Sequence, residues 1–169
     1  MSSEPTIIDR PAQPYVAVRG LITMQTFHLI ADRFPEVFGW LAQRGIEPTG
    51  APFFKYNVID MSHEMELEAG VPVAHAVAAD GSMFGAELPA GRYVTLTHRG
   101  HPQELVGVTG GLLAWAAERG IECDSAPSDR GEQWAARLEF QLTDPRVEPD
   151  MNKWETQLAF KIRSNDRPA

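Results

Sequence analysis

The chain has 169 residues, of which 43% are hydrophobic and 22% charged, and its formal net charge is −8 at pH 7. This size and composition are typical of one soluble globular domain, or of two small halves that share a core. The acidic excess, without a stripe of lysine and arginine, excludes a phosphate-tracking protein, so no nucleic-acid partner is expected. No apolar run is long enough to span a bilayer, no secretory signal opens the chain, and the single Cys123 fits a reducing cytoplasm.

The first predicted elements are a strand, a helical stretch and two more strands. The alternating run YVAVRG predicts a strand over residues 15–20. Apolar residues at helical spacing predict a helix over residues 27–41, which Pro35 should kink or restart. The runs PFFKYNVIDM, residues 52–61, and HEMELEAGVPV, residues 63–73, then predict two strands.

The same order of elements follows in the second part of the chain. A strand is predicted over residues 93–100 (YVTLTHRG), and a helix over residues 102–120, which opens with proline and stops at glycine. The runs WAARLEFQLTD, residues 134–144, and KWETQLAFKI, residues 153–162, predict two strands. A proline-bearing loop over residues 144–155 leads into the last of them.

An internal repeat relates the two parts. The segment WLAQRGIEPTGAP, residues 40–52, matches WAAERGIECDSAP, residues 115–127, at eight of thirteen positions. A strand-helix-strand-strand unit used twice predicts an α+β fold with one antiparallel sheet and its helices on one face. A central cleft is expected on the pseudo-twofold axis, with one wall from each half.

The repeat also sets the domain organisation. We predict one domain over residues 13–163, made of two pseudo-symmetric halves at about 13–75 and 85–163. The chain ends, residues 1–12 and 163–169, are predicted to be flexible tails.

Strand alternation indicates which polar side chains share a face. In residues 63–73 the apolar positions alternate with glutamates, so Glu66 and Glu68 share the face away from the helices. Aligning the two halves places Glu66 over Glu155 and Glu68 over Gln157, with Glu139 in the preceding strand. The simplest interpretation of Glu66 and Glu68 is a solvated sheet face.

These features resemble the GyrI-like (gyrase-inhibitor-like) small-molecule-binding domains. Such domains also occur as effector-binding modules of bacterial multidrug-responsive transcription activators. The resemblance covers residues 15–162 and is carried by PFFKYNVID with the GVPV strand, by ELPAGRYVTLTHRG, and by DPRVEPDMNKWETQLAF. It implies a tandem strand-helix-strand-strand (SHS2-type) fold around a cleft for lipophilic, often cationic compounds, with a glutamate near the cleft floor.

The resemblance also implies a set of site residues. Its glutamate is matched by Glu155, with Glu139 as neighbour, whereas Gln157 stands where a second acidic residue is expected. The full set of expected ligand-binding residues is Glu155, Glu139, Gln157, Tyr93, Tyr56, Trp134, Glu66 and Asn57. For Tyr56 the two arguments conflict, because strand parity sends it to the helix side while the resemblance places it in the cleft.

Three functions follow from this resemblance. The first is a free-standing cytoplasmic module that binds hydrophobic, possibly cationic small molecules without a cofactor or metal. The second is a hydrolase that opens strained cyclopropane rings of DNA-alkylating natural products, with Glu155 or Glu139 as general base and Tyr56 or Tyr93 polarising the electrophile. The third is a gyrase or toxin modulator that acts by protein interaction. The oligomeric state is not predicted.

One further pattern concerns histidine. His98 and His101 have i, i+3 spacing at the exit of a predicted strand, and the sequence indicates no acidic or cysteine partner beside them. This arrangement favours a surface turn over a metal site.

Overall fold

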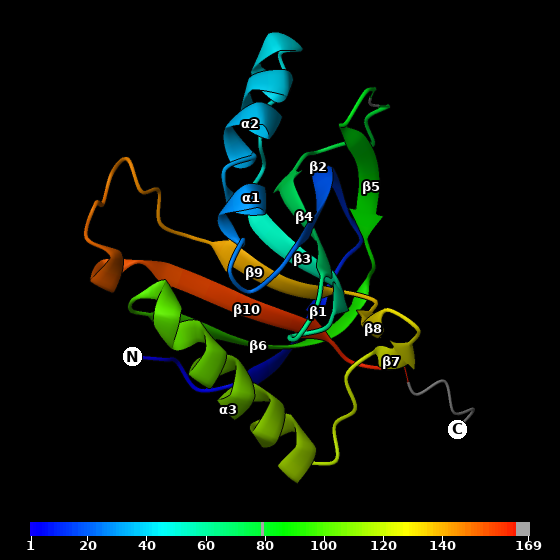
Figure 1. Ribbon diagram of the computed structural model, residues 1–169, viewed down its shortest axis with the longest axis vertical. Helices are drawn as coiled ribbons and strands as arrows, with labels where there is room; N and C mark the ends of the chain where they lie inside the picture. Colours follow the sequence, from blue (N-terminus) through cyan, green and yellow to red (C-terminus); the bar gives the residue numbers. More distant parts are fainter. Residues whose placement is uncertain (79, 165–169) are drawn as a thin grey trace.

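A computed structural model describes residues 1–78 and 80–164 of the chain (Figure 1). Its strands are β1 (Thr6–Arg10), β2 (Gln13–Ile22), β3 (Phe53–Ile59), β4 (Met65–Pro72), β5 (Phe84–Leu88), β6 (Gly91–Arg99), β7 (Ser125–Ser128), β8 (Gly131–Trp134), β9 (Arg137–Gln141) and β10 (Glu155–Lys161). Its helices are α1 (His28–Ala31), α2 (Phe34–Gln43) and α3 (Leu105–Glu118), with short 3-10 turns at Pro102–Glu104 and Met151–Lys153.

The predicted unit occurs twice, as β2-α1-α2-β3-β4 and as β6-α3-β9-β10. All pairings are antiparallel, and the order across the curled sheet is β1-β6-β10-β9-β3-β4-β2-β5. The two halves meet at the centre, where β3 pairs with β9 and Phe53 lies opposite Phe140. This arrangement confirms the predicted α+β fold with two related halves.

The helices cover one face of the sheet. The register places Phe54, Glu139 and Leu158 in one row on that face. In the first half, Val37 and Leu41 of α2 pack on β2 and β4, and in the second half Leu112 of α3 packs on β6 and β10. Burial of these alternating apolar residues supplies the main driving force for both layers. As predicted, the helix of the first half is broken, and Pro35 lies in the first turn of α2.

The opposite face of the sheet carries a row of aromatic rings. Tyr15 packs edge-on against Phe53 at 5.2 Å between ring centroids, and Phe53 packs against Phe140 at 5.4 Å. Phe84 of β5 lies 6.4 Å from Tyr15 and continues the row at one end. Such tilted and edge-to-face contacts are favourable because they bring positive ring edges to negative ring faces.

The repeated sequence segments build the same helix ending in both halves. Gly45 and Gly120 both have φ of +67°, the left-handed conformation in which glycine stops a helix. Just before each glycine, an arginine guanidinium stacks over the tryptophan four residues earlier and donates a hydrogen bond to its carbonyl oxygen. The pairs are Trp40 with Arg44 at 3.8 Å and Trp115 with Arg119 at 4.1 Å. The identical residues of the repeat therefore encode a capped helix end.

Four strands lie outside the predicted pattern. Residues 6–10, inside the predicted N-terminal tail, form β1, in which Ile8 pairs with Tyr93 of β6. Strand β5 pairs with β2, and the hairpin β7–β8 joins the sheet through β3. Residues 165–169 of the predicted C-terminal tail lie outside the described residues. Within the described part of the chain, no helix is long and apolar enough to cross a membrane.

Candidate functional site

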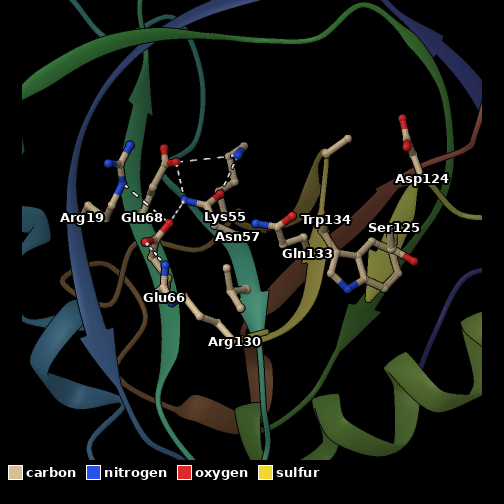
Figure 2. A pocket seen from close by; sticks show the side chains of 13 residues that line it. Arg19, Lys55, Asn57, Glu66, Glu68, Asp124, Ser125, Arg130, Gln133 and Trp134 are labelled. Carbon is tan, nitrogen blue, oxygen red and sulfur yellow. Dashed lines mark hydrogen bonds and ion pairs between the residues drawn. The ribbon is translucent and has the colours of Figure 1, made fainter. Parts of the chain in front are cut away.

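A hollow of about 510 Å³ lies between strands β2–β4 of the first half and the hairpin β7–β8 of the second half (Figure 2). Its wall is mostly polar, with Asn57, Ser125 and Gln133 among its lining residues and the Trp134 indole as its large aromatic group. The charged lining residues are Arg19, Lys55, Arg130, Glu66, Glu68 and Asp124. Both halves of the repeat therefore contribute to one site.

Glu68 is the buried carboxylate of this hollow, and only 3% of the residue is exposed. The Tyr15 hydroxyl donates to its Oε1 at 2.5 Å, the Asn57 amide donates to its Oε2 at 2.6 Å, and Lys55 Nζ lies 3.6 Å from Oε2. Burial and the neighbouring Glu68 carboxylate raise the pKa of Tyr15, so this phenol remains a proton donor. Glu68 is thus held in place by short, charge-assisted contacts.

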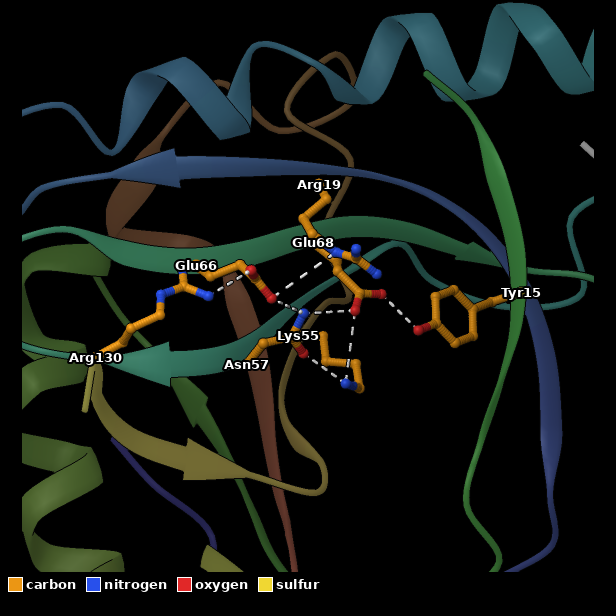
Figure 3. Close-up of polar contacts among 7 residues, drawn as sticks. All are labelled: Tyr15, Arg19, Lys55, Asn57, Glu66, Glu68 and Arg130. Carbon is orange, nitrogen blue, oxygen red and sulfur yellow. Dashed lines mark hydrogen bonds and ion pairs between the residues drawn. The ribbon is translucent and has the colours of Figure 1, made fainter. Parts of the chain in front are cut away.

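Glu66 is held more loosely (Figure 3). The Asn57 amide donates to its Oε2 at 3.1 Å, while Arg130 approaches its Oε1 at 3.4 Å and Arg19 Nε lies 3.8 Å from Oε2. The side chain of Glu66 is 20% exposed, and those of Arg19 and Arg130 are 54% and 56% exposed. Ion pairs this exposed contribute little to stability, so both arginines can exchange for another cation.

The structure brings three predicted site residues to this hollow, namely Glu66, Asn57 and Trp134. Trp134 is nearly buried, and its indole N–H donates to Glu132 Oε1 at 2.6 Å. The bond fixes the ring at the hollow wall. Strand parity had placed Glu66 on the face away from the helices, where it is found.

Buried Glu139 and half-buried Tyr56 form a separate pair on the helix face, and they do not line the hollow. The Tyr56 hydroxyl donates to Glu139 Oε1 at 3.0 Å, and the Arg137 guanidinium lies 5.6 Å from the Tyr56 ring centroid. Burial raises the pKa of Glu139, and burial together with the Glu139 charge raises the pKa of Tyr56. For Tyr56, strand parity predicted the correct face.

The remaining predicted residues also lie outside the lining of the hollow. Glu155 is exposed at the start of β10, where its backbone N–H donates to Thr143 Oγ1 at 2.9 Å. Gln157 is half-buried opposite Phe140. The Tyr93 hydroxyl donates to the Pro89 carbonyl oxygen at 2.7 Å, and burial raises the pKa of Tyr93 to about 12.

Several lining residues were absent from the predicted set, notably Arg19, Lys55 and Arg130. A signal existed for Lys55, because alternation in β3 places it on the face opposite to Phe54. The strand register then brings it opposite Glu68. Arg130 lies in the turn between β7 and β8. The sequences of these two short strands, SAPS and GEQW, show no alternation of apolar and polar residues. No sequence pattern therefore indicated that Arg130 would reach Glu66.

His98 corrects another sequence-based expectation, because it is buried rather than part of a surface turn. Its Nδ1 lies 2.7 Å from Ser2 Oγ, and its Nε2 lies 3.0 Å from Glu104 Oε1. The acidic partner is six residues away along the chain, in the 3-10 turn that follows β6. Among the described residues, no group of three or more His, Cys, Asp or Glu side chains is arranged to hold a metal ion.

An antiparallel sheet of two related halves, with helices on one face and a shared hollow, defines a small α+β domain with one candidate ligand site. Residues 3–129 match the family described as GyrI-like small molecule binding domain. The chain belongs to this family, which confirms the resemblance recognised in the sequence.

Solved structures of low sequence identity share the fold. The C-terminal domain of EcmrR has a TM-score of 0.75 and 16% identity, over 95% of this chain and 98% of that one. The EcmrR chain in a complex with DNA has a TM-score of 0.77 and 16% identity over 95% of this chain, which spans 57% of that chain's length.

Two further structures are similar over most of both chains. SAV2435 bound to tetraphenylphosphonium has a TM-score of 0.60 and 10% identity, over 96% of this chain and 95% of that one. A hydrolase from Listeria innocua has a TM-score of 0.64 and 14% identity, over 95% of this chain and 92% of that one. None of the curated proteins matches the chain in sequence.

Proposed function

We propose that the protein binds small molecules that carry an aromatic body and a cationic group, in the hollow around Glu66. The main support for this proposal is that Glu66 is a largely buried carboxylate with two exposed arginine partners. Arg130 lies 3.4 Å and Arg19 lies 3.8 Å from its carboxylate oxygens. An incoming cation can replace these arginines, which return to water at little cost. The ligand of SAV2435, tetraphenylphosphonium, has the same chemistry.

The aromatic part of the ligand supplies most of the binding free energy. Burial of roughly 300 Å² of apolar ligand surface contributes about 7 kcal/mol at about 25 cal/mol per Å². Loss of translational and rotational freedom offsets much of this gain, so we expect micromolar affinity. Trp134 is the large aromatic residue in the lining of the hollow, and the Tyr15 hydroxyl holds Glu68 in place by a hydrogen bond.

The test is a calorimetric titration with tetraphenylphosphonium of the wild type, Glu66→Gln and Glu155→Gln. We expect saturable binding that Glu66→Gln weakens about tenfold, because the substitution removes the charge attraction between the carboxylate and the ligand cation, which is about 1 kcal/mol or more for two unit charges about 4 Å apart. Glu155→Gln, which alters an exposed carboxylate outside the hollow, is the matched control and should bind like the wild type. The reverse pattern would move the ligand site to Glu155, and no binding to any of the three would overturn the proposal.

The hydrolase alternative requires a carboxylate that can take a proton from water. Glu68 lines the hollow, but both of its carboxylate oxygens already accept hydrogen bonds, one from the Tyr15 hydroxyl and one from the Asn57 amide, so neither is free to take a proton from a water molecule. The pKa of Glu139 is raised, yet this residue is absent from the hollow lining. Binding without turnover is therefore the function that the geometry favours. Formation of a water adduct from a strained-ring electrophile, detected by mass, would contradict it.

A further inference from the structure

Arg19 contacts two chemical groups at once, one on each side of its strand. Its guanidinium carbon lies 4.7 Å from the ring centroid of Phe84, and its Nε lies 3.8 Å from Glu66 Oε2. The topology explains this double contact, because β2 pairs with β5, which carries Phe84, and with β4, which carries Glu66. Arg19 is also a lining residue of the hollow, and Figure 3 shows its side chain beside Glu66.

These two partners are the ones that an aromatic cation needs. A carboxylate balances its charge, and an aromatic face attracts it through the ring quadrupole. In the described structure, Arg19 covers the Phe84 ring and shares the Glu66 carboxylate. A ligand cation cannot occupy the same positions until this guanidinium moves away. More than half of the Arg19 side chain is exposed, so solvent is available to receive it.

Resting on the proposed function, we propose that Arg19 is an internal cation that competes with the ligand and thereby sets the affinity and charge selectivity of the hollow. Arg19 shares the Glu66 carboxylate with Asn57 and Arg130, and its guanidinium covers the Phe84 ring. When a more apolar cation enters, Arg19 exchanges its place for water. Ligands must therefore outbind a guanidinium, and weakly hydrophobic cations are rejected.

Two other arginines help to separate this role from a general charge effect. Arg130 lies even closer to Glu66, at 3.4 Å, but it stacks on no aromatic ring among the described residues. Arg10 stacks over Phe140 at 4.6 Å from the ring centroid, but it is not part of the hollow lining. Among the described residues, Arg19 alone combines the carboxylate, the ring and the hollow.

The experiment compares two ligands of similar shape and different charge. Tetraphenylphosphonium carries a permanent positive charge, and triphenylphosphine oxide is its neutral counterpart. Calorimetric titrations use the wild type, Arg19→Gln, Arg19→Ala and the control Arg130→Gln. Arg19→Gln keeps part of the aliphatic stem over Phe84, and Arg19→Ala uncovers the ring. Circular dichroism and thermal melting confirm that each variant is folded.

We expect both Arg19 variants to bind tetraphenylphosphonium about tenfold more tightly than the wild type, the scale of one desolvated cation–π contact. Their affinity for triphenylphosphine oxide should change by less than about twofold, because a neutral ligand gains no charge contact. Arg130→Gln should increase the affinity for tetraphenylphosphonium less than either Arg19 variant does.

Unchanged or weaker cation binding by the Arg19 variants would overturn the inference while the proposed function stands. An equal gain for Arg130→Gln would also overturn it, since the effect would then be one of overall charge. If no folded protein binds tetraphenylphosphonium, the proposed function fails, and the inference fails with it. Weak binding of tetraphenylphosphonium by the wild type, together with tighter binding by the Arg19 variants, would support both the proposed function and the inference about Arg19.

Discussion

Glu139 shows how one buried side chain ties stability to pH. Burial raises its pKa above the ordinary value of 4.5, while the Tyr56 hydrogen bond and the charge of Arg137 oppose the rise. A carboxyl group whose pKa is raised in the folded state contributes its full stability below its unfolded pKa, and this contribution is lost as pH rises through the folded pKa. The contribution of Glu139 to the free energy of unfolding therefore decreases as the pH rises above about 4.5.

This sign gives a prediction for Glu139→Gln, which keeps the shape of the side chain and does not titrate. Its free energy of unfolding relative to the wild type should increase as the pH rises from acid towards neutral. Urea unfolding at a series of pH values measures the difference. Glu155→Gln, which removes one negative charge at an exposed position, is the control for the change in net charge. A pH-independent difference for Glu139→Gln would mean that Glu139 has the same pKa in the folded and unfolded chain.

At the scale of single elements, α3 offers two glycines whose replacement should have opposite effects. Gly120 ends the helix at φ of +67°, and a Cβ there would meet no atom within 4 Å, so the cost is backbone strain alone. Gly110 lies inside α3, and a Cβ there would also meet nothing within 4 Å. Gly120→Ala should destabilise the protein by about 1 kcal/mol, whereas Gly110→Ala should stabilise it by about 0.5–1 kcal/mol.

Urea unfolding measures both changes in the free energy of unfolding, provided that the variants and the wild type have the same dependence of this free energy on urea concentration. Gly45→Ala provides an internal repeat of the experiment, because Gly45 ends α2 with the same φ and the same open surroundings. It should cost as much as Gly120→Ala. If the two helix-ending glycines differed widely, the duplicated sequence would not act as an equivalent stop signal in both halves.

For the molecule as a whole, the repeated unit follows from local sequence patterns, whereas the hollow does not. Alternation in residues 15–20, 63–73 and 93–100 is local, and it correctly indicated strands and the face on which Glu66 lies. The hollow depends instead on long-range contacts, such as the approach of Arg130 to Glu66 across 64 positions of the chain. Such contacts follow from the pairing of β8 with β3, which no local periodicity encodes.

The N-terminal segment poses the same problem, because its strand forms only by pairing with a distant one. Strand β1 adds to β6, Ser3 N–H donates to the Thr97 carbonyl oxygen at 2.8 Å, and Arg10 lies over the Phe140 ring. Removal of residues 1–10 would expose this edge of the sheet and remove Ile8 from the buried apolar cluster against which it packs.

We therefore expect a chain that begins at residue 11 to lose roughly 2 kcal/mol of unfolding free energy, about the value of burying one aliphatic side chain. Arg10→Ala in the full-length chain should account for only part of that loss, since it removes the cation–π contact and leaves the strand pairing intact. Urea unfolding of the three proteins side by side separates the two contributions. Equal midpoints for the shortened and full-length chains would mean that residues 1–10 behave in solution as the flexible tail predicted from the sequence.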